Sequence, residues 1–153
     1  MIAILMDTLF EPVEETTLGL VALFEICADG RHVLLTNPTW KKSPRVDAWL
    51  GALPRRTRAE AERVLDRSIA ANAKLARGTP RVRVDDVKAC RWDGSPPVLD
   101  VKTALRLLRT PLRLLVENRF SDGAFVRKVL GPANRQVLDQ AIGHGWVEIE
   151  QGG

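Results

Sequence analysis

Two carboxylates, Glu117 and Asp122, are the residues of this chain best placed for chemistry. Glu117 follows the run Leu112–Val116, in which four of five residues are apolar, and Asp122 comes five positions later in a polar, glycine-bearing turn. A carboxylate at the end of a buried strand, facing the start of the next helix, stays ionised and suits a divalent cation and a phosphate. Because Mg²⁺ takes one or two protein carboxylates together with waters and substrate phosphates, the pair predicts a magnesium site.

The same spacing also fits a purely structural role for both acids. Asp122 would then help Ser121 to cap the following helix, and Glu117 would pair with Arg113 or Arg119. The spacing alone leaves both interpretations open.

The segment Leu114-Leu-Val-Glu-Asn-Arg-Phe-Ser-Asp-Gly-Ala-Phe125 resembles the opening of a topoisomerase–primase (Toprim) domain. It is most similar to the Toprim modules of overcoming-lysogenisation-defect nucleases and related phage-defence proteins. The resemblance implies a magnesium-dependent site that cuts or joins phosphodiesters, with Glu117 as general acid/base or metal-associated residue and Asp122 in support. Residues 147–149 would form the second strand of that family.

The sequence departs from this family at two points. Asn118 stands where the family usually has glycine, and no Asp-x-Asp motif, which the family carries on a later strand, occurs in the sequence; Asp85 and Asp86 are adjacent and lie upstream. The missing acids would come from another polypeptide or from a longer form of this chain, or the domain would be a non-catalytic relative. We therefore expect a component of a magnesium-dependent endonuclease system, in antiviral defence, that is incomplete alone.

Asp7 offers an alternative companion for Glu117. It follows the apolar run 1–6, and the two acids would lie together if strands 1–6 and 112–117 were neighbours in one sheet. An aspartate at such a strand end is also seen in PIN-type ribonucleases. The other interpretation of Asp7 is a helix cap or a surface acid.

The elements that must position these acids follow an α/β pattern. Apolar runs and period-two alternation predict strands at residues 1–6, 31–36, 81–86, 112–117 and 145–150. Helical spacing and capping signals predict helices from near residue 12 to 28 and at 44–53, 57–77, 100–109, 121–130 and 133–142. The strand–helix–strand order favours a parallel or mixed sheet with flanking helices. The Gly/Pro-rich stretch 93–97 predicts a boundary between an accessory α/β region, 1–95, and a partial Toprim-like region, 98–153.

Charge is unevenly distributed along the chain. Residues 1–30 hold six acids and no Lys or Arg, whereas residues 31–91 hold fifteen bases and six acids. Such a basic stretch attracts phosphate backbones or an acidic partner. Within it, a helical stripe is a candidate nucleic-acid contact: Arg56, Arg63, Arg67 and Lys74. The alternative is a solvated helix face, paired with Glu60, Glu62 and Asp66.

The remaining features concern location and partners. No apolar run approaches the length needed to span a membrane, and Cys27 and Cys90 lack metal-ligand spacing, so we expect a cytoplasmic protein with two thiols. Trp40 and Trp92 lie in polar surroundings and are candidates for contacting a protein partner. The rival to the nuclease hypothesis is therefore a non-catalytic adaptor that binds a larger protein.

Overall fold

The computed structural model describes residues 1–11, 14–118 and 120–152 of the 153-residue chain. The chain has the predicted α/β fold and divides into unit 1, Met1–Arg109, and unit 2, Thr110–Gly153. Its strands are β1 (Ile2–Met6), β2 (Val33–Asn37), β3 (Arg81–Val84), β4 (Val98–Leu99), β5 (Leu112–Val116) and β6 (Val147–Gln151). Its helices are α1 (Glu14–Cys27), α2 (Pro44–Ala52), α3 (Arg55–Asn72), α4 (Val101–Arg109), α5 (Ser121–Val129) and α6 (Pro132–Gly143), with short 3-10 turns η1 (Asp7–Phe10) and η2 (Trp40–Lys42).

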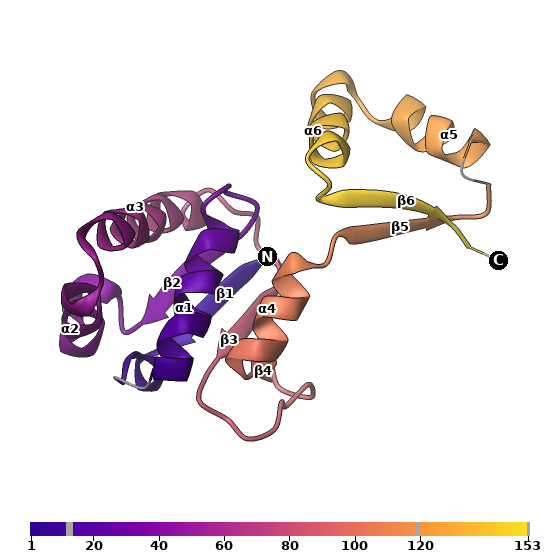
Figure 1. The fold of residues 1–153 in the computed structure, drawn as a ribbon. Helices are drawn as coiled ribbons and strands as arrows, with labels where there is room; N and C mark the ends of the chain where they lie inside the picture. Colours follow the sequence, from indigo (N-terminus) through magenta and orange to yellow (C-terminus); the bar gives the residue numbers. More distant parts are fainter. Residues whose placement is uncertain (12–13, 119, 153) are drawn as a thin grey trace. The chain divides into compact units, whose positions relative to one another are not determined.

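Unit 1 is built on a four-stranded parallel sheet in the order β2-β1-β3-β4 (Figure 1). β1 lies inside this sheet, with Ala3 in register with Leu34 of β2 and with Val82 of β3. This position explains its sequence, because an inner parallel strand needs apolar side chains facing both ways. α1 contacts both α3 and α4, and α3 runs beside β2.

The core of unit 1 lies between the sheet and these helices. Leu5, Leu20, Leu34 and Leu108 are fully buried there. Trp49 of α2 closes one end of the core, stacked on Phe24 and edge-on to Phe10, with ring centroids 5.4 Å apart in both pairs. Aromatic pairs at these separations and angles add to the free energy gained by burial.

Side-chain caps start two helices of unit 1 as the sequence predicts. The Val46 N–H donates to Ser43 Oγ (3.1 Å) at the start of α2, and the Thr103 N–H donates to Asp100 Oδ1 (2.9 Å) at the start of α4. The helix start predicted at residue 57 is wrong, because α3 begins two residues earlier, directly after Pro54. Proline has a backbone conformation suited to the position before a helix, and the Arg58 N–H donates to the Pro54 carbonyl (2.9 Å).

The division between the units differs from the boundary predicted at residues 93–97. That stretch lies inside unit 1, because the chain beyond it returns to the sheet as β4 and pairs with β3. The Arg91 and Val98 backbones also hydrogen-bond reciprocally across the stretch (2.8 and 2.9 Å). The Gly/Pro-rich residues therefore form a loop within one unit.

Unit 2 is a small parallel unit with the order β5-α5-α6-β6. The two strands pair in parallel, with Leu112 in register with Val147 and Val116 with Gln151. Both helices lie on one face of the pair (Figure 1), where Gly123 of α5 approaches Ile149 of β6. The strand at 112–116 is confirmed, but its predicted burial is wrong: Leu112 and Leu115 are 68% and 66% exposed, because only two strands form the sheet.

Candidate functional site

Glu117 lies at the carboxyl edge of the β5–β6 pair. It directly follows β5 and its side chain is exposed. The Gly152 N–H donates to the Val116 carbonyl (2.8 Å), so the ends of both strands meet beside Glu117. In open parallel sheets this edge is where functional groups gather.

Asp122 holds the turn that follows Glu117. Its Oδ2 accepts the Asn118 N–H (2.8 Å), while Asn118 Oδ1 accepts the N–H groups of Phe120 (3.0 Å) and Ser121 (3.2 Å). The Asp122 N–H in turn donates to the Asn118 carbonyl (2.9 Å), which extends helical bonding back to Asn118. This reciprocal cap matches the structural interpretation of Asp122, with Asn118 in the capping position that we expected of Ser121.

Among the described residues, Glu117 makes no ion pair with the arginines predicted for it. Arg113, one predicted partner, makes an ion pair with Glu150 of β6 (3.5 Å) across the strands. Arg119, the other, lies outside the described residues. Glu117 is thus the exposed acid of the edge, and Asp122 stands five residues on with its carboxylate committed to the turn.

Asp7 does not share a sheet with Glu117. β1 belongs to the four-stranded sheet of unit 1 and β5 to the two-stranded sheet of unit 2, so the proposed neighbourhood of these strands is wrong. Asp7 instead accepts a hydrogen bond from Ser43 Oγ and lies 3.6 Å from Arg45 Nε. These contacts tie the end of β1 to the start of α2, as expected of a surface acid with a structural role.

Asp85 is an acid of the unit 1 sheet edge that sequence reasoning did not place. It follows β3, which lies next to β1, and its Oδ1 accepts the Thr8 hydroxyl (2.5 Å). The β1–β3 junction is where the strand order reverses, the usual ligand position in a doubly wound sheet. Asp7 and Asp85 therefore end neighbouring strands.

Within residues 1–11, 14–118 and 120–152, no three His, Cys, Asp or Glu side chains form a group that could hold a metal ion.

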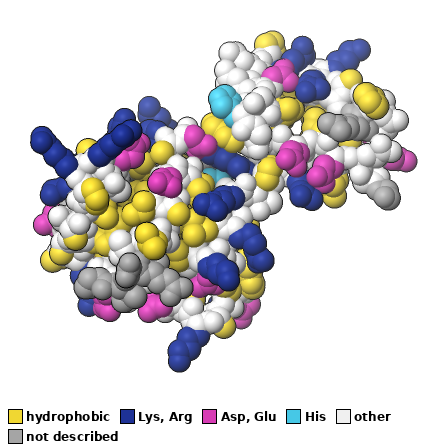
Figure 2. Space-filling view, in the orientation of Figure 1, with side chains coloured by type: hydrophobic (Ala, Val, Ile, Leu, Met, Phe, Trp, Pro, Cys, Tyr) yellow, Lys and Arg dark blue, Asp and Glu magenta, His cyan; other side chains and the backbone are white. Residues whose placement is uncertain are grey.

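The basic stripe predicted on α3 is dispersed in the structure. Arg63 pairs with Glu60 on its own helix, and Arg67 donates to the backbone carbonyls of Ala28 (2.8 Å) and Cys27 (2.6 Å) at the end of α1. Lys74 lies beyond the end of α3 and is exposed. Figure 2 shows Lys and Arg side chains at several separate places on the visible face of unit 1. The alternative interpretation, a solvated face, therefore describes these contacts better.

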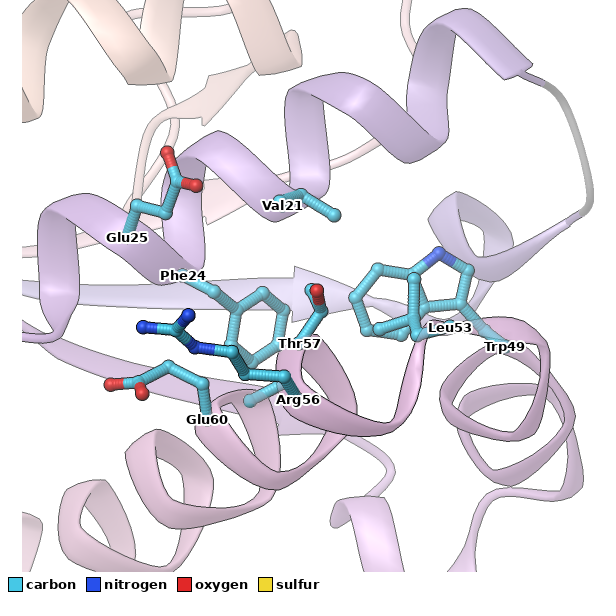
Figure 3. Close-up of a pocket in the computed structure, with 9 residues that line it drawn as sticks. Val21, Phe24, Glu25, Trp49, Leu53, Arg56, Thr57 and Glu60 are labelled. Carbon is cyan, nitrogen blue, oxygen red and sulfur yellow. The ribbon is translucent and has the colours of Figure 1, made fainter.

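Arg56 lines a pocket of about 280 Å³ between α1, α2 and α3. Figure 3 shows Phe24 and Trp49 in its interior, with Arg56 projecting from α3 and Glu25 from α1. The aromatic side chains are part of the unit 1 core, and acids stand beside the one arginine. This mixture of charges does not single out a phosphate-binding site.

Two ionisable groups of unit 1, the buried Cys27 and the half-buried Asp100, have shifted pKa values. Burial raises the pKa of the Cys27 thiol to about 12, so the group stays protonated at neutral pH. Burial would by itself raise the pKa of Asp100, but hydrogen bonds from Cys90 Sγ (3.0 Å) and Thr103 outweigh it and lower that pKa to about 2. Asp100 is therefore an ionised cap for α4.

The tryptophans predicted to contact a partner differ from each other. Trp92 is 57% exposed, as a contact residue requires, whereas Trp40 is half-buried against the core with its ring 5.1 Å from Lys41 Nζ.

Among the described residues, no helix has the length and apolar character needed to cross a membrane. Comparisons of this chain with protein-family models, with curated proteins and with solved structures found no match.

Proposed function

We propose that this chain contributes one carboxylate edge to a magnesium-dependent site that cleaves phosphodiesters in nucleic acid. The observation that carries the proposal is the position of Glu117: exposed, directly after β5, and at the edge where two parallel strands end together. The Toprim-like sequence 114–125 falls on this strand, turn and helix. Antiviral defence and a cytoplasmic location belong to the same proposal, and the two free thiols support the latter.

In this proposal the two predicted site residues have different roles. Glu117 acts as the general acid/base or as a Mg²⁺ ligand, because its side chain is exposed directly after β5 and makes no hydrogen bond or ion pair with the described residues. Asp122 is a positioning residue, since its carboxylate holds the Asn118 N–H and thereby the loop behind Glu117. Bound Mg²⁺ would supply charge stabilisation to a transferring phosphate.

Further carboxylates must complete such a site, because one exposed acid and one acid committed to a turn are few for a metal pair. The sequence holds no Asp-x-Asp motif, and a second polypeptide or a longer form of this chain would therefore contribute the remaining acids. Cleavage is expected only when both components are present.

The test is a nuclease assay with Mg²⁺ on DNA and on RNA, performed with this chain alone and with proteins encoded beside it. Glu117→Gln removes the charge with little change in shape and should lower cleavage at least about 100-fold. Glu148→Gln is the matched control, because Glu148 is an exposed acid of the neighbouring strand β6. Wild-type activity in Glu117→Gln would overturn the assignment.

Exposed apolar side chains favour a second candidate function, a protein-binding adaptor. On unit 2, Phe120 is 87% exposed, Phe125 63% and Val129 61%, and hydrophobic side chains reach the surface there (Figure 2). Apolar patches of this kind mark protein contacts. Association with a protein partner that is insensitive to salt and is lost in Phe125→Ser would favour the adaptor. Binding to DNA that weakens steeply with salt would favour the nuclease component.

A further inference from the structure

The pocket of about 280 Å³ between α1, α2 and α3 has room for a small ligand; we call it the α1–α3 pocket. Its apolar wall includes Val21 and Phe24 of α1, Trp49 of α2, and Leu53, which follows α2. An engineered apolar cavity of about 150 Å³ accommodates benzene, whereas drug-sized ligands fill about 300–1,000 Å³. The pocket therefore suits a compact apolar group that carries a small polar head. It belongs to unit 1, whereas the carboxylate edge belongs to unit 2.

The apolar wall combines accessible side chains with a preformed base. Val21 and Leu53 are half-buried, so a ligand in the pocket can contact them. Phe24 and Trp49 are core side chains that stack on each other, with 5.4 Å between their ring centroids. Because this stacked pair is already packed in the core, a ligand does not have to order it.

Three polar side chains that line the pocket have no partner within the described part of the chain. Arg56 and Glu25 are exposed and make no ion pair or hydrogen bond there, and the side chain of the half-buried Thr57 makes no hydrogen bond. Glu60, the remaining charged residue of the wall, is paired with Arg63. The pocket thus offers one positive charge, one negative charge and one hydroxyl group to a ligand.

Opposite charges at one pocket favour a ligand that carries both charges. A simple anion would be attracted by Arg56 but repelled by Glu25, and a simple cation would meet the reverse. A guanidinium group matches the geometry of a carboxylate, and a carboxylate accepts from an ammonium group. In Figure 3 the charged groups of Arg56 and Glu25 lie toward the Phe24 side of the pocket, and Leu53 lies toward the other side. A ligand with both charges at one end and an apolar group at the other matches this arrangement.

We infer that the α1–α3 pocket binds a free α-amino acid with an apolar side chain, such as leucine or phenylalanine. The ligand carboxylate accepts hydrogen bonds from the Arg56 guanidinium and the Thr57 hydroxyl. The ligand ammonium group donates to the Glu25 carboxylate, and the ligand side chain packs against Val21 and Leu53. This inference does not depend on the proposed nuclease role.

The test follows the methyl signals of Val21 and Leu53 by NMR in the ¹³C-methyl-labelled chain. The probes are L-leucine, isocaproate, which lacks the amino group of leucine, and isoamylamine, which lacks its carboxylate. The Val21 and Leu53 signals should shift and saturate with L-leucine, while the signals of the exposed Leu115 in unit 2 stay in place. L-Leucine should bind at least about tenfold more tightly than either analogue, because only L-leucine pairs with both charges.

Two variants assign each charge of the ligand to its partner. Arg56→Met should weaken the binding of L-leucine and isocaproate about tenfold without weakening that of isoamylamine. Glu25→Gln should weaken the binding of L-leucine and isoamylamine about tenfold without weakening that of isocaproate. Arg55→Met and Glu148→Gln are the matched controls, because both residues are exposed and lie outside the pocket, and they should leave all three affinities unchanged.

Three results would overturn the inference. The first is that neither L-leucine nor L-phenylalanine shifts the Val21 or Leu53 signals up to its solubility limit. The second is that Arg56→Met and Glu25→Gln leave the affinity for L-leucine unchanged, or that either analogue binds as tightly as L-leucine. The third is tighter binding of N-acetyl-leucinamide, which has the same side chain without charges and would identify the pocket as a site for an apolar side chain of a protein partner.

Discussion

The two units of the chain bury their apolar residues to very different degrees. In unit 1, leucines from β1, β2, α1 and α4 are fully buried in a single core. In the described part of unit 2, Gly123 is the only buried residue. Both units contain parallel strands followed by helices, so the difference does not come from the type of element. It comes from the number of strands: four form the sheet in unit 1 and two in unit 2.

The buried core that stabilises the fold lies in unit 1, whereas the candidate site residue Glu117 lies in unit 2. A two-stranded sheet has little independent stability, and parallel sheets normally have both faces covered. On β5 the side chains of Arg113 and Leu115 point away from α5 and α6, because Gly123 packs on Ile149 on the opposite face. Unit 2, which carries Glu117, is therefore the part whose structure is expected to depend most on a binding partner.

The largest expected effect is a contrast between two leucine truncations. Leu34→Ala removes a fully buried side chain from the unit 1 core and should lower the free energy of unfolding of unit 1 by about 2–5 kcal/mol. Leu115→Ala removes a side chain that is 66% exposed and should change the stability of unit 2 by less than about 0.5 kcal/mol. Urea titrations followed by the amide NMR signals of each unit measure both values. A large loss in Leu115→Ala would show that this face is covered in solution.

Local signals explain which parts of the fold could be predicted. β1 has an apolar run, and α2 and α4 have Ser43 and Asp100 as caps, all of which act within a few residues. β4 was missed because Val98–Leu99 is too short to show any period. The boundary predicted from the Gly/Pro-rich stretch 93–97 differs from the observed division after Arg109, because β4 returns the chain to the sheet of unit 1. Burial of β5 was misjudged because an apolar run does not reveal how many strands will cover it.

Only those features of the candidate site that follow from neighbouring residues in the sequence could be predicted. Glu117 at a strand end follows directly from the run before it, and this position is confirmed. The proximity of Asp85 to Asp7 depends on β3 lying beside β1, which no local pattern specifies. The role of Asp122 depends on Asn118, whose side chain and N–H both take part in the turn. Arg67 similarly finds its carbonyl partners 39 and 40 residues away.

A smaller effect is expected from one carboxylate at a helix start in each unit, Asp100 before α4 and Asp122 in the first turn of α5. Asp100→Ala should lower the stability of unit 1 by about 1 kcal/mol at neutral pH, because α4 loses its cap. Asp122→Ala should cost about 0.5 kcal/mol and disturb only the turn after Glu117 in unit 2. Thermal unfolding with amide NMR in each unit measures the two losses. We expect the larger loss in unit 1 because α4 packs on a buried core, and equal losses in both units would contradict this expectation.

The pH dependence of stability provides a further test of the role of Asp100. The folded-state pKa of Asp100 is lowered from 3.8 to about 2, so the folded protein binds this proton less readily than the unfolded chain. The stabilisation is complete above about pH 4 and is lost as the pH falls toward 2. The stability difference between wild type and Asp100→Ala should shrink over this range. A difference that stays constant down to pH 2 would show that the cap does not depend on ionisation.

The last comparison concerns one arginine in each unit, and the smallest expected effect is that of Arg113 in unit 2. Arg67→Met removes the two hydrogen bonds to the last carbonyls of α1 and should cost unit 1 about 1 kcal/mol. Arg113→Met removes a cross-strand ion pair whose side chains are 58% and 37% exposed, and should cost unit 2 about 0.3 kcal/mol. Added salt should leave the first loss unchanged and abolish the second, because salt screens exposed charges. If Arg113→Met cost more than Arg67→Met in urea titrations, the β5–β6 pair would be held by its open face rather than by α5 and α6.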